Sequence, residues 1–146
     1  MTNPYASFSS SEKLESEGIF IEEPTFRVRV RRAGGRNMAY KKATEAAFRP
    51  YRRAIDNGSM DEEVARRLTV KVFAETVVSG WQVLDDKTGE FVDGIHDPET
   101  GKVVTYSSEV VIAVFTKLPD LFDYVLRCAT NSSLFLEDLV EADKGN

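Results

Sequence analysis

The chain has 146 residues, a formal net charge of −5 and 42% hydrophobic residues. This length and composition predict one globular domain with a hydrophobic core, and they exclude a chain that is disordered over most of its length. No apolar run approaches the roughly 18 residues that a transmembrane helix needs, so we expect no membrane segment. One cysteine, Cys128, and one histidine, His96, exclude an internal disulfide and the common structural zinc sets.

Charge is unevenly distributed along the chain. The formal net charge is −4 over residues 1–25, +8 over residues 26–71 and −9 over residues 72–146. A basic block can bind nucleic acid or an acidic protein surface, and it can equally be a solvated surface that faces the chain's own acidic half. The overall acidity and the lack of a recognisable reading helix count against a nucleic-acid partner.

Residues 1–17 are rich in Ser and Glu and hold few large apolar groups. They predict a flexible N-terminal arm, followed by a single globular domain over residues 18–146. The arm lacks the apolar core of a signal peptide, so we expect no secretion by that route.

The next segment alternates apolar and basic side chains, and this period of two predicts a strand. The apolar positions are Phe26, Val28 and Val30, and the basic positions are Arg27, Arg29 and Arg31. Three like charges on one face repel one another, so we interpret these arginines as candidates for partner binding or assembly. The alternative is that acidic residues of the C-terminal half cover them within the chain. Gly34 and Gly35, which follow, predict a tight turn.

A basic amphipathic helix is expected after this turn. Asn37 can cap a helix that begins at Met38. Pro50 lacks a backbone N–H and clashes with the preceding turn, so it should kink this helix or begin a second one.

A further helix is expected from about Met60, because Ser59 and Glu62 have the spacing of a capping box. The run of β-branched residues over 70–78 leaves a strand open as the alternative for the end of this element. Gly80 is expected to close the element.

Two similar acidic turns, residues 85–90 and 96–102, lie between short apolar runs. Each combines Asp with a glycine at turn spacing, which predicts hairpins or a small three-stranded meander. Trp81 precedes both turns and is either a core anchor or a hot spot for partner binding. We favour the core, because aromatic side chains usually bury most of their area.

The C-terminal third has three apolar stripes with helical spacing, and Ser107 or Ser108 and Pro119 mark helix starts. With Trp81, the residues predicted to be buried are Val114, Phe115, Leu118, Phe122 and Val125. The third stripe contains Phe135, Leu136, Leu139 and Val140. The predicted fold class is therefore a helix-dominated α+β domain with an N-terminal strand, a central hairpin region and C-terminal helices.

No motif that catalysis or cofactor binding requires is present in the sequence. His96 lies near Asp93, Asp97 and Glu99, but turn-forming aspartates and a solvated histidine explain this cluster more simply than a metal site. We therefore predict that the protein is not an enzyme and has neither a cofactor nor a metal.

The order of motifs in the second half is more specific. A helix runs into Trp81, an acidic turn with Gly89 follows, and a helix cap and a Leu-Pro corner come after it. The cap is Tyr106-Ser107-Ser108-Glu109, and the corner is Leu118-Pro119-Asp120-Leu121-Phe122. Over about residues 60–136 this order resembles the tail assembly chaperones of long-tailed bacteriophages. The connection between Trp81 and Tyr106 is longer than in that pattern.

The resemblance implies a non-enzymatic protein of the host cytoplasm that binds the tape measure protein and helps tail tube subunits to assemble on it. It also implies absence from the finished particle, and it allows homo-oligomers and a longer product made by a translational frameshift. The candidates for partner binding are Arg27, Arg29, Arg31, Trp81 and Phe135. The alternatives are a structural tail or connector protein of the virion and a regulator that binds nucleic acid through its basic block.

Overall fold

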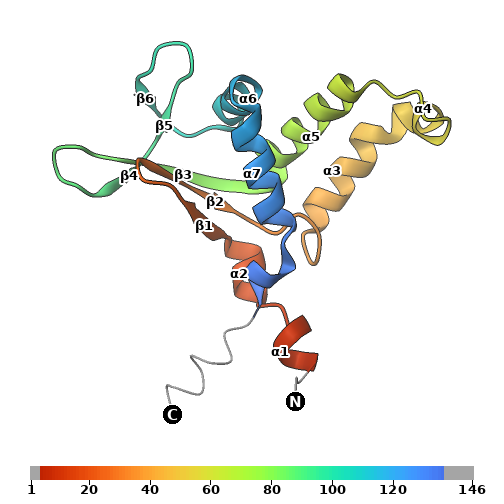
Figure 1. Ribbon diagram of the computed structural model, residues 1–146, viewed down its shortest axis with the longest axis horizontal. Coiled ribbons are helices and arrows are strands. Elements are labelled where there is room, and N and C mark those ends of the chain that lie inside the picture. The colour runs from red at the N-terminus through yellow and green to blue at the C-terminus, as the bar shows by residue number, and fades with distance from the viewer. Residues whose placement is uncertain (1–3, 137–146) are drawn as a thin grey trace.

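The computed structural model describes residues 4–136 and has the helix-dominated α+β fold that the sequence predicts (Figure 1). The N-terminal half contains α1 (Pro4–Phe8), α2 (Glu12–Glu17), β1 (Ile19–Glu22), β2 (Phe26–Val30), α3 (Met38–Phe48), the 3₁₀ helix η1 (Arg49–Tyr51), α4 (Arg52–Asp56) and α5 (Glu62–Thr76). The C-terminal half contains β3 (Val78–Leu84), β4 (Phe91–Asp93), β5 (Ile95–His96), β6 (Val103–Val104), α6 (Ser108–Lys117), α7 (Pro119–Thr130) and the 3₁₀ helix η2 (Ser132–Phe135).

Strands β1 to β4 form one antiparallel sheet in the order β1-β2-β3-β4, and β5 pairs with β6 in a separate hairpin. In the register of β2 and β3, Val28 lies opposite Trp81, and Arg29 lies opposite Gly80. One face of the sheet packs against α5, α6 and α7 (Figure 1). In β2, Val28 and Val30 face these helices and are buried, so Arg27 and Arg29 lie on the opposite face. The two acidic turns therefore close two hairpins, β3–β4 and β5–β6.

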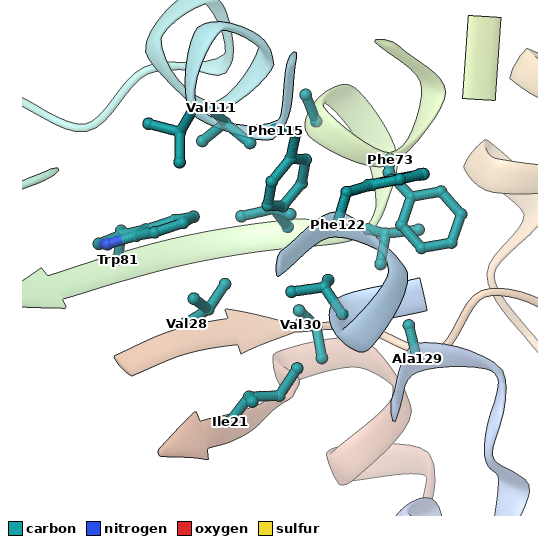
Figure 2. Close-up of a cluster of buried hydrophobic side chains, with 14 of the residues drawn as sticks. Ile21, Val28, Val30, Phe73, Trp81, Val111, Phe115, Phe122 and Ala129 are labelled. Atoms are coloured by element: carbon teal, nitrogen blue, oxygen red, sulfur yellow. The ribbon is translucent and has the colours of Figure 1, made fainter. Parts of the chain in front are cut away.

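The core lies between the sheet and these helices (Figure 2). A series of six aromatic rings runs through it, with neighbouring ring centroids 5.2–6.1 Å apart. In order of contact the rings belong to Phe26, Trp81, Phe115, Phe122, Phe73 and Tyr40. The series joins β2, β3, α6, α7, α5 and α3, so it connects the sheet to every long helix.

Asn37 caps α3 as the sequence predicts, because its Oδ1 accepts a hydrogen bond from the Tyr40 N–H at 3.1 Å. Its Nδ2 donates to the carbonyl oxygens of Arg32 and Thr76, both at 3.0 Å. This one side chain therefore ties the start of α3 to the end of α5. Pro50 lies in η1, directly after the end of α3.

The start of α5 differs from the prediction. Asp61 caps the helix, and its carboxylate accepts the N–H of Glu63 at 2.8 Å. The predicted cap, Ser59, instead donates its hydroxyl to the side chain of Asn57. Asn57 and Ser59 close the preceding turn together, which leaves Asp61 to begin the helix.

The β-branched run over residues 70–78 could be either helix or strand, and the structure contains both. The helix ends at Thr76, and a strand begins at Val78. Gly80 lies inside this strand, so the prediction that it closes the element was wrong. Its missing side chain faces Arg29 across the strand pair, where an added Cβ would lie 3.6 Å from the Arg29 Cβ.

Residues 10–17 of the predicted arm contact the domain in the structure. The Ser11 N–H donates to the Phe135 carbonyl oxygen at 2.7 Å, and Ser10 forms a β-bridge with Leu136. Residues 1–3 of the predicted arm lie outside the described residues. The attachment is polar, so the apolar content of the segment could not reveal it.

Glu15 of α2 anchors this segment. The side chain is almost fully buried, and its carboxylate accepts hydrogen bonds from the Ser10 hydroxyl at 2.8 Å and from Arg32 Nη1 at 3.1 Å. The backbone N–H of Arg36 donates to it at 3.3 Å. The predicted tight turn brings this N–H to the carboxylate, and a Cβ at Gly35 would overlap Glu15 Oε1.

Most of the predicted core is confirmed. The buried members are Trp81, Val114, Phe115, Phe122 and Val125. Leu118 is 50% exposed, and its predicted burial was wrong because it lies at the corner between α6 and α7, where the stripe of α6 ends. The third stripe begins in η2, and its positions Leu139 and Val140 lie outside the described residues.

The aromatic series predicts which core substitution costs most. Phe115→Ala should lower the free energy of unfolding by about 3–5 kcal/mol, because the cavity would separate Trp81 from Phe122. Leu118→Ala should cost about 1 kcal/mol, because its side chain is only half-buried. Chemical denaturation of both variants checks this, and equal losses would contradict the assignment of Phe115 to the centre of the core.

The Glu15 anchor makes part of the stability depend on pH. Burial raises the pKa of its carboxyl group, but hydrogen bonds from Ser10, Arg36 and Arg32 and the charge of Arg32 lower it below its ordinary value of 4.5. A pKa that is lower in the folded state stabilises the fold above the unfolded-state pKa. This contribution is lost as the pH falls through the folded-state pKa.

We expect Glu15→Gln to lower the free energy of unfolding at pH 7 by about 1–3 kcal/mol, because the hydrogen bonds lose their charged acceptor. The difference between the natural chain and the variant should shrink as the pH falls below about 4.5. Denaturation at several pH values checks this, with the exposed Glu12→Gln as control. A difference that stays constant with pH would contradict the anchor.

Candidate functional site

Arg27 lies between two aromatic rings on the sheet face opposite to α5, α6 and α7. Its guanidinium carbon is 4.4 Å from the Phe20 ring centroid and 4.6 Å from that of Phe91. Its Nε donates to Gln82 Oε1 at 2.7 Å, and its Nη1 is 3.5 Å from Glu22 Oε1. The charge of Arg27 is therefore satisfied within the chain, by rings, an amide and a carboxylate of β1 rather than by carboxylates of the C-terminal half.

The other two arginines have different surroundings. Arg29 is exposed, and its Nε lies 3.3 Å from the hydroxyl of Ser79. Arg31 follows the end of β2, and its Nε donates to the carbonyl oxygen of Ser16 at 2.9 Å. Arg29 and Arg31 are therefore both exposed, but Arg29 lies within β2, whereas Arg31 binds the end of α2.

Tyr106 fixes the segment that enters α6. Its hydroxyl donates to the carbonyl oxygen of Val78 at 3.0 Å. Burial raises the pKa of Tyr106, and the charges of Arg31 and Arg29 oppose this rise. The hydroxyl therefore remains protonated near neutral pH and serves as a structural donor.

An open cleft of about 360 Å³ lies where the β5–β6 hairpin meets the corner between α6 and α7. Its lining is mostly apolar and consists of Phe26, Trp81, Ile95, His96, Asp97, Pro98, Gly101, Val114, Lys117, Leu118 and Leu121. Phe26 and Trp81 stack with their ring planes 10° apart and begin the aromatic series of the core. We call this feature the apolar cleft.

Local sequence signals build both walls of the apolar cleft. On one side, Pro119 occupies the first turn of α7, and Leu118 links α6 to α7 with half of its surface exposed. On the other side, Asp97 Oδ1 accepts the Glu99 N–H at 2.8 Å, and Gly101 adopts a φ of 72° that closes the turn. The longer connection that departs from the chaperone pattern is therefore the segment that forms the second wall.

The structure separates the predicted partner-binding residues. Trp81 lines the apolar cleft, although it is only 5% exposed. Phe135 is fully buried and does not line the apolar cleft. Its carbonyl oxygen accepts a hydrogen bond from the Ser11 N–H of the N-terminal segment. Leu118 is an accessible apolar residue of the cleft that the sequence analysis expected to be buried. The signal was its position before Pro119, because the residue before a proline is disfavoured in the helical conformation and so lies at a helix end.

The chemistry of the apolar cleft suits binding of an apolar side chain. His96, Asp97 and Lys117 are its charged or titratable lining residues. Among residues 4–136, no group of three or more His, Cys, Asp and Glu side chains is placed to hold a metal ion. In the same part of the chain, no helix is both long and apolar enough to cross a membrane.

The fold and the cleft define a small α+β protein with an open apolar cleft. The model of the YdaY prophage protein family matches residues 35–146, which is most of the chain. The chain therefore belongs to the YdaY prophage protein family, and this membership supports a phage origin. The match includes every lining residue of the apolar cleft except Phe26. No curated protein and no solved structure matches the chain.

Because Arg27 and Arg29 have different surroundings, we expect their substitution to change the free energy of unfolding by different amounts. Arg27→Ala should lower the free energy of unfolding by about 1–2 kcal/mol, because it removes two ring contacts and a short hydrogen bond. Arg29→Ala should change it by less than about 0.5 kcal/mol, because this side chain is exposed. Urea denaturation of both variants distinguishes them, and similar values would show that the two rings do not hold Arg27.

Proposed function

We propose that this phage protein is a tail assembly chaperone that binds the tape measure protein and promotes tail tube assembly in the host cytoplasm, without catalysis. The observation that carries the proposal is the half-exposed Leu118 at an open apolar cleft. The cleft is built from Trp81, the inserted hairpin and the Leu-Pro corner. Trp81 and the Leu-Pro corner belong to the order of motifs that resembles tail assembly chaperones, whereas the inserted hairpin is not part of that pattern. The phage family supports the same setting.

The tape measure protein, as the client of the chaperone, has exposed apolar side chains that such a cleft can cover. A long helical tape measure protein exposes apolar stripes before the tail tube encloses it, and exposed stripes aggregate unless they are covered. An apolar side chain from such a helix can enter the cleft next to Leu118, as in other helix-in-groove contacts. Lys117 and Asp97 at the cleft offer charges of both signs to the polar flanks of the helix.

The tail tube subunit requires a second surface. Arg29 is exposed on the sheet face opposite to the helices, next to the partly exposed Phe20. A chaperone that brings a subunit to its client must contact both at once. Arg29 therefore stays our candidate for contact with the tail tube subunit.

Leu118→Asp tests the client-binding role. The residue is half-exposed and precedes α7, where it makes no side-chain cap, so an aspartate is favourable there and the variant should fold. We expect the amount of tape measure protein that co-purifies to fall at least about ten-fold, which corresponds to about 1.4 kcal/mol. The measurement is co-purification from cells that express both proteins of the same prophage.

The matched control is Leu134→Asp. Leu134 is 41% exposed in η2 and does not line the apolar cleft. This variant should retain the client. Equal loss in both variants, or no loss in either, would contradict the proposed site.

The amount of this protein in purified virions distinguishes a chaperone from the alternative, a structural tail or connector protein. Mass spectrometry of purified particles should find the protein absent or far below the amount of the tail tube subunit. Stoichiometric persistence in mature particles would contradict the chaperone role.

A further inference from the structure

Strand β1 forms an open edge of the sheet. It pairs with β2 on one side, in a register that places Phe20 opposite Arg29 and Ile21 opposite Val28. Within residues 4–136, no backbone hydrogen bond joins the other side of β1 to any element. An edge of this kind presents a row of unpaired N–H and C=O groups that can pair with another strand.

The sequence of β1 favours pairing over most of its four residues, and Glu22 at its end is its one charged residue. Its residues are Ile19, Phe20, Ile21 and Glu22, and the first three favour strands strongly. Proline, lysine and inward-pointing charges, which natural proteins place on edges to prevent pairing, are absent from this strand. Phe20 is 38% exposed, although it is a large aromatic side chain. Such an edge favours a strand partner over solvent.

We infer that β1 pairs antiparallel with β1 of a second copy of this chain, with Phe20 directly opposite Phe20 of the second copy. Antiparallel pairing of identical strands gives a closed two-fold dimer, in which the same patch is used by both chains. The two rings cover each other on the exposed face, and aromatic cross-strand pairs are favourable. The two four-stranded sheets become one continuous sheet.

Charge complementarity supports this register. With the two Phe20 residues opposite each other, Glu22 of one copy lies opposite Gly18 of the other. Gly18 has no side chain and directly precedes Ile19, whose partner in β2 is Val30, the residue before the exposed Arg31. Glu22 of one copy would therefore approach the basic end of β2 in the other copy. The two Glu22 residues lie at opposite ends of the new strand pair and do not repel each other.

Other registers lose these contacts. A shift of one residue would place side chains of the core face opposite side chains of the exposed face. A shift of two residues would place Phe20 opposite Glu22 of the second copy and would break the aromatic pair. The register centred on Phe20 therefore keeps the aromatic pair and holds the two Glu22 residues apart.

Sedimentation of the isolated protein tests the dimer. We expect a concentration-dependent mass of two chains for the natural sequence and at least ten-fold weaker association for Phe20→Lys, which would place two like charges directly opposite each other. The matched control is Phe8→Lys, because Phe8 is 84% exposed in α1, and this variant should remain dimeric. Circular dichroism confirms that each variant is folded.

Cystine formation tests the register without relying on a disruptive variant. In a Cys128→Ser background, Phe20→Cys should form an intermolecular disulfide on mild oxidation. Glu22→Cys should not, because its two copies would lie about 14 Å apart along the strands. A monomeric natural chain at all concentrations would overturn the inference, and so would equal association of the two lysine variants or equal cross-linking at both cysteine positions. These tests use the protein alone, so their outcome is independent of the client.

Discussion

The contact between Trp81 and Phe115 is the connection on which the rest of the structure depends. Trp81 belongs to the sheet and Phe115 to α6, and their ring centroids lie 6.1 Å apart (Figure 2). On one side the series of rings continues to α7, α5 and α3, and on the other side it ends at Phe26 beside the apolar cleft. The same packing that holds the helices on the sheet therefore also positions the residues of the cleft.

Local signals predicted those parts of the fold that depend on few residues. The alternation around Val28 identified β2, Asn37 identified the start of α3, and Pro119 identified the first turn of α7. Two features that depend on distant residues were not predicted. Glu15 is buried because distant arginines and a glycine turn surround it, and nothing within its own polar segment indicates this. Leu118 continued an apolar stripe in sequence, but the corner after α6 turns it toward solvent.

The candidate site was only partly predictable for the same reason. Trp81 and the Leu-Pro corner were recognised as motifs, whereas the cleft arises because the β5–β6 hairpin lies against that corner, and no local pattern specifies this placement. For the arginines the local pattern was correct but incomplete. Their alternation was read correctly, yet Arg27 is enclosed by rings from β1 and β4 that the pattern could not reveal. A two-fold pairing through β1 would present two apolar clefts to one long client, which would increase its apparent affinity.

The central claim is that the apolar cleft receives an apolar side chain of the tape measure protein. Trp81 is the single tryptophan of the chain and lines the cleft, so its fluorescence reports directly on occupancy. The most direct measurement is a titration with a helical segment of the tape measure protein that contains no tryptophan. We expect a saturable change in Trp81 emission that is lost in Leu118→Asp. Binding that calorimetry detects while the emission of Trp81 stays unchanged would contradict it.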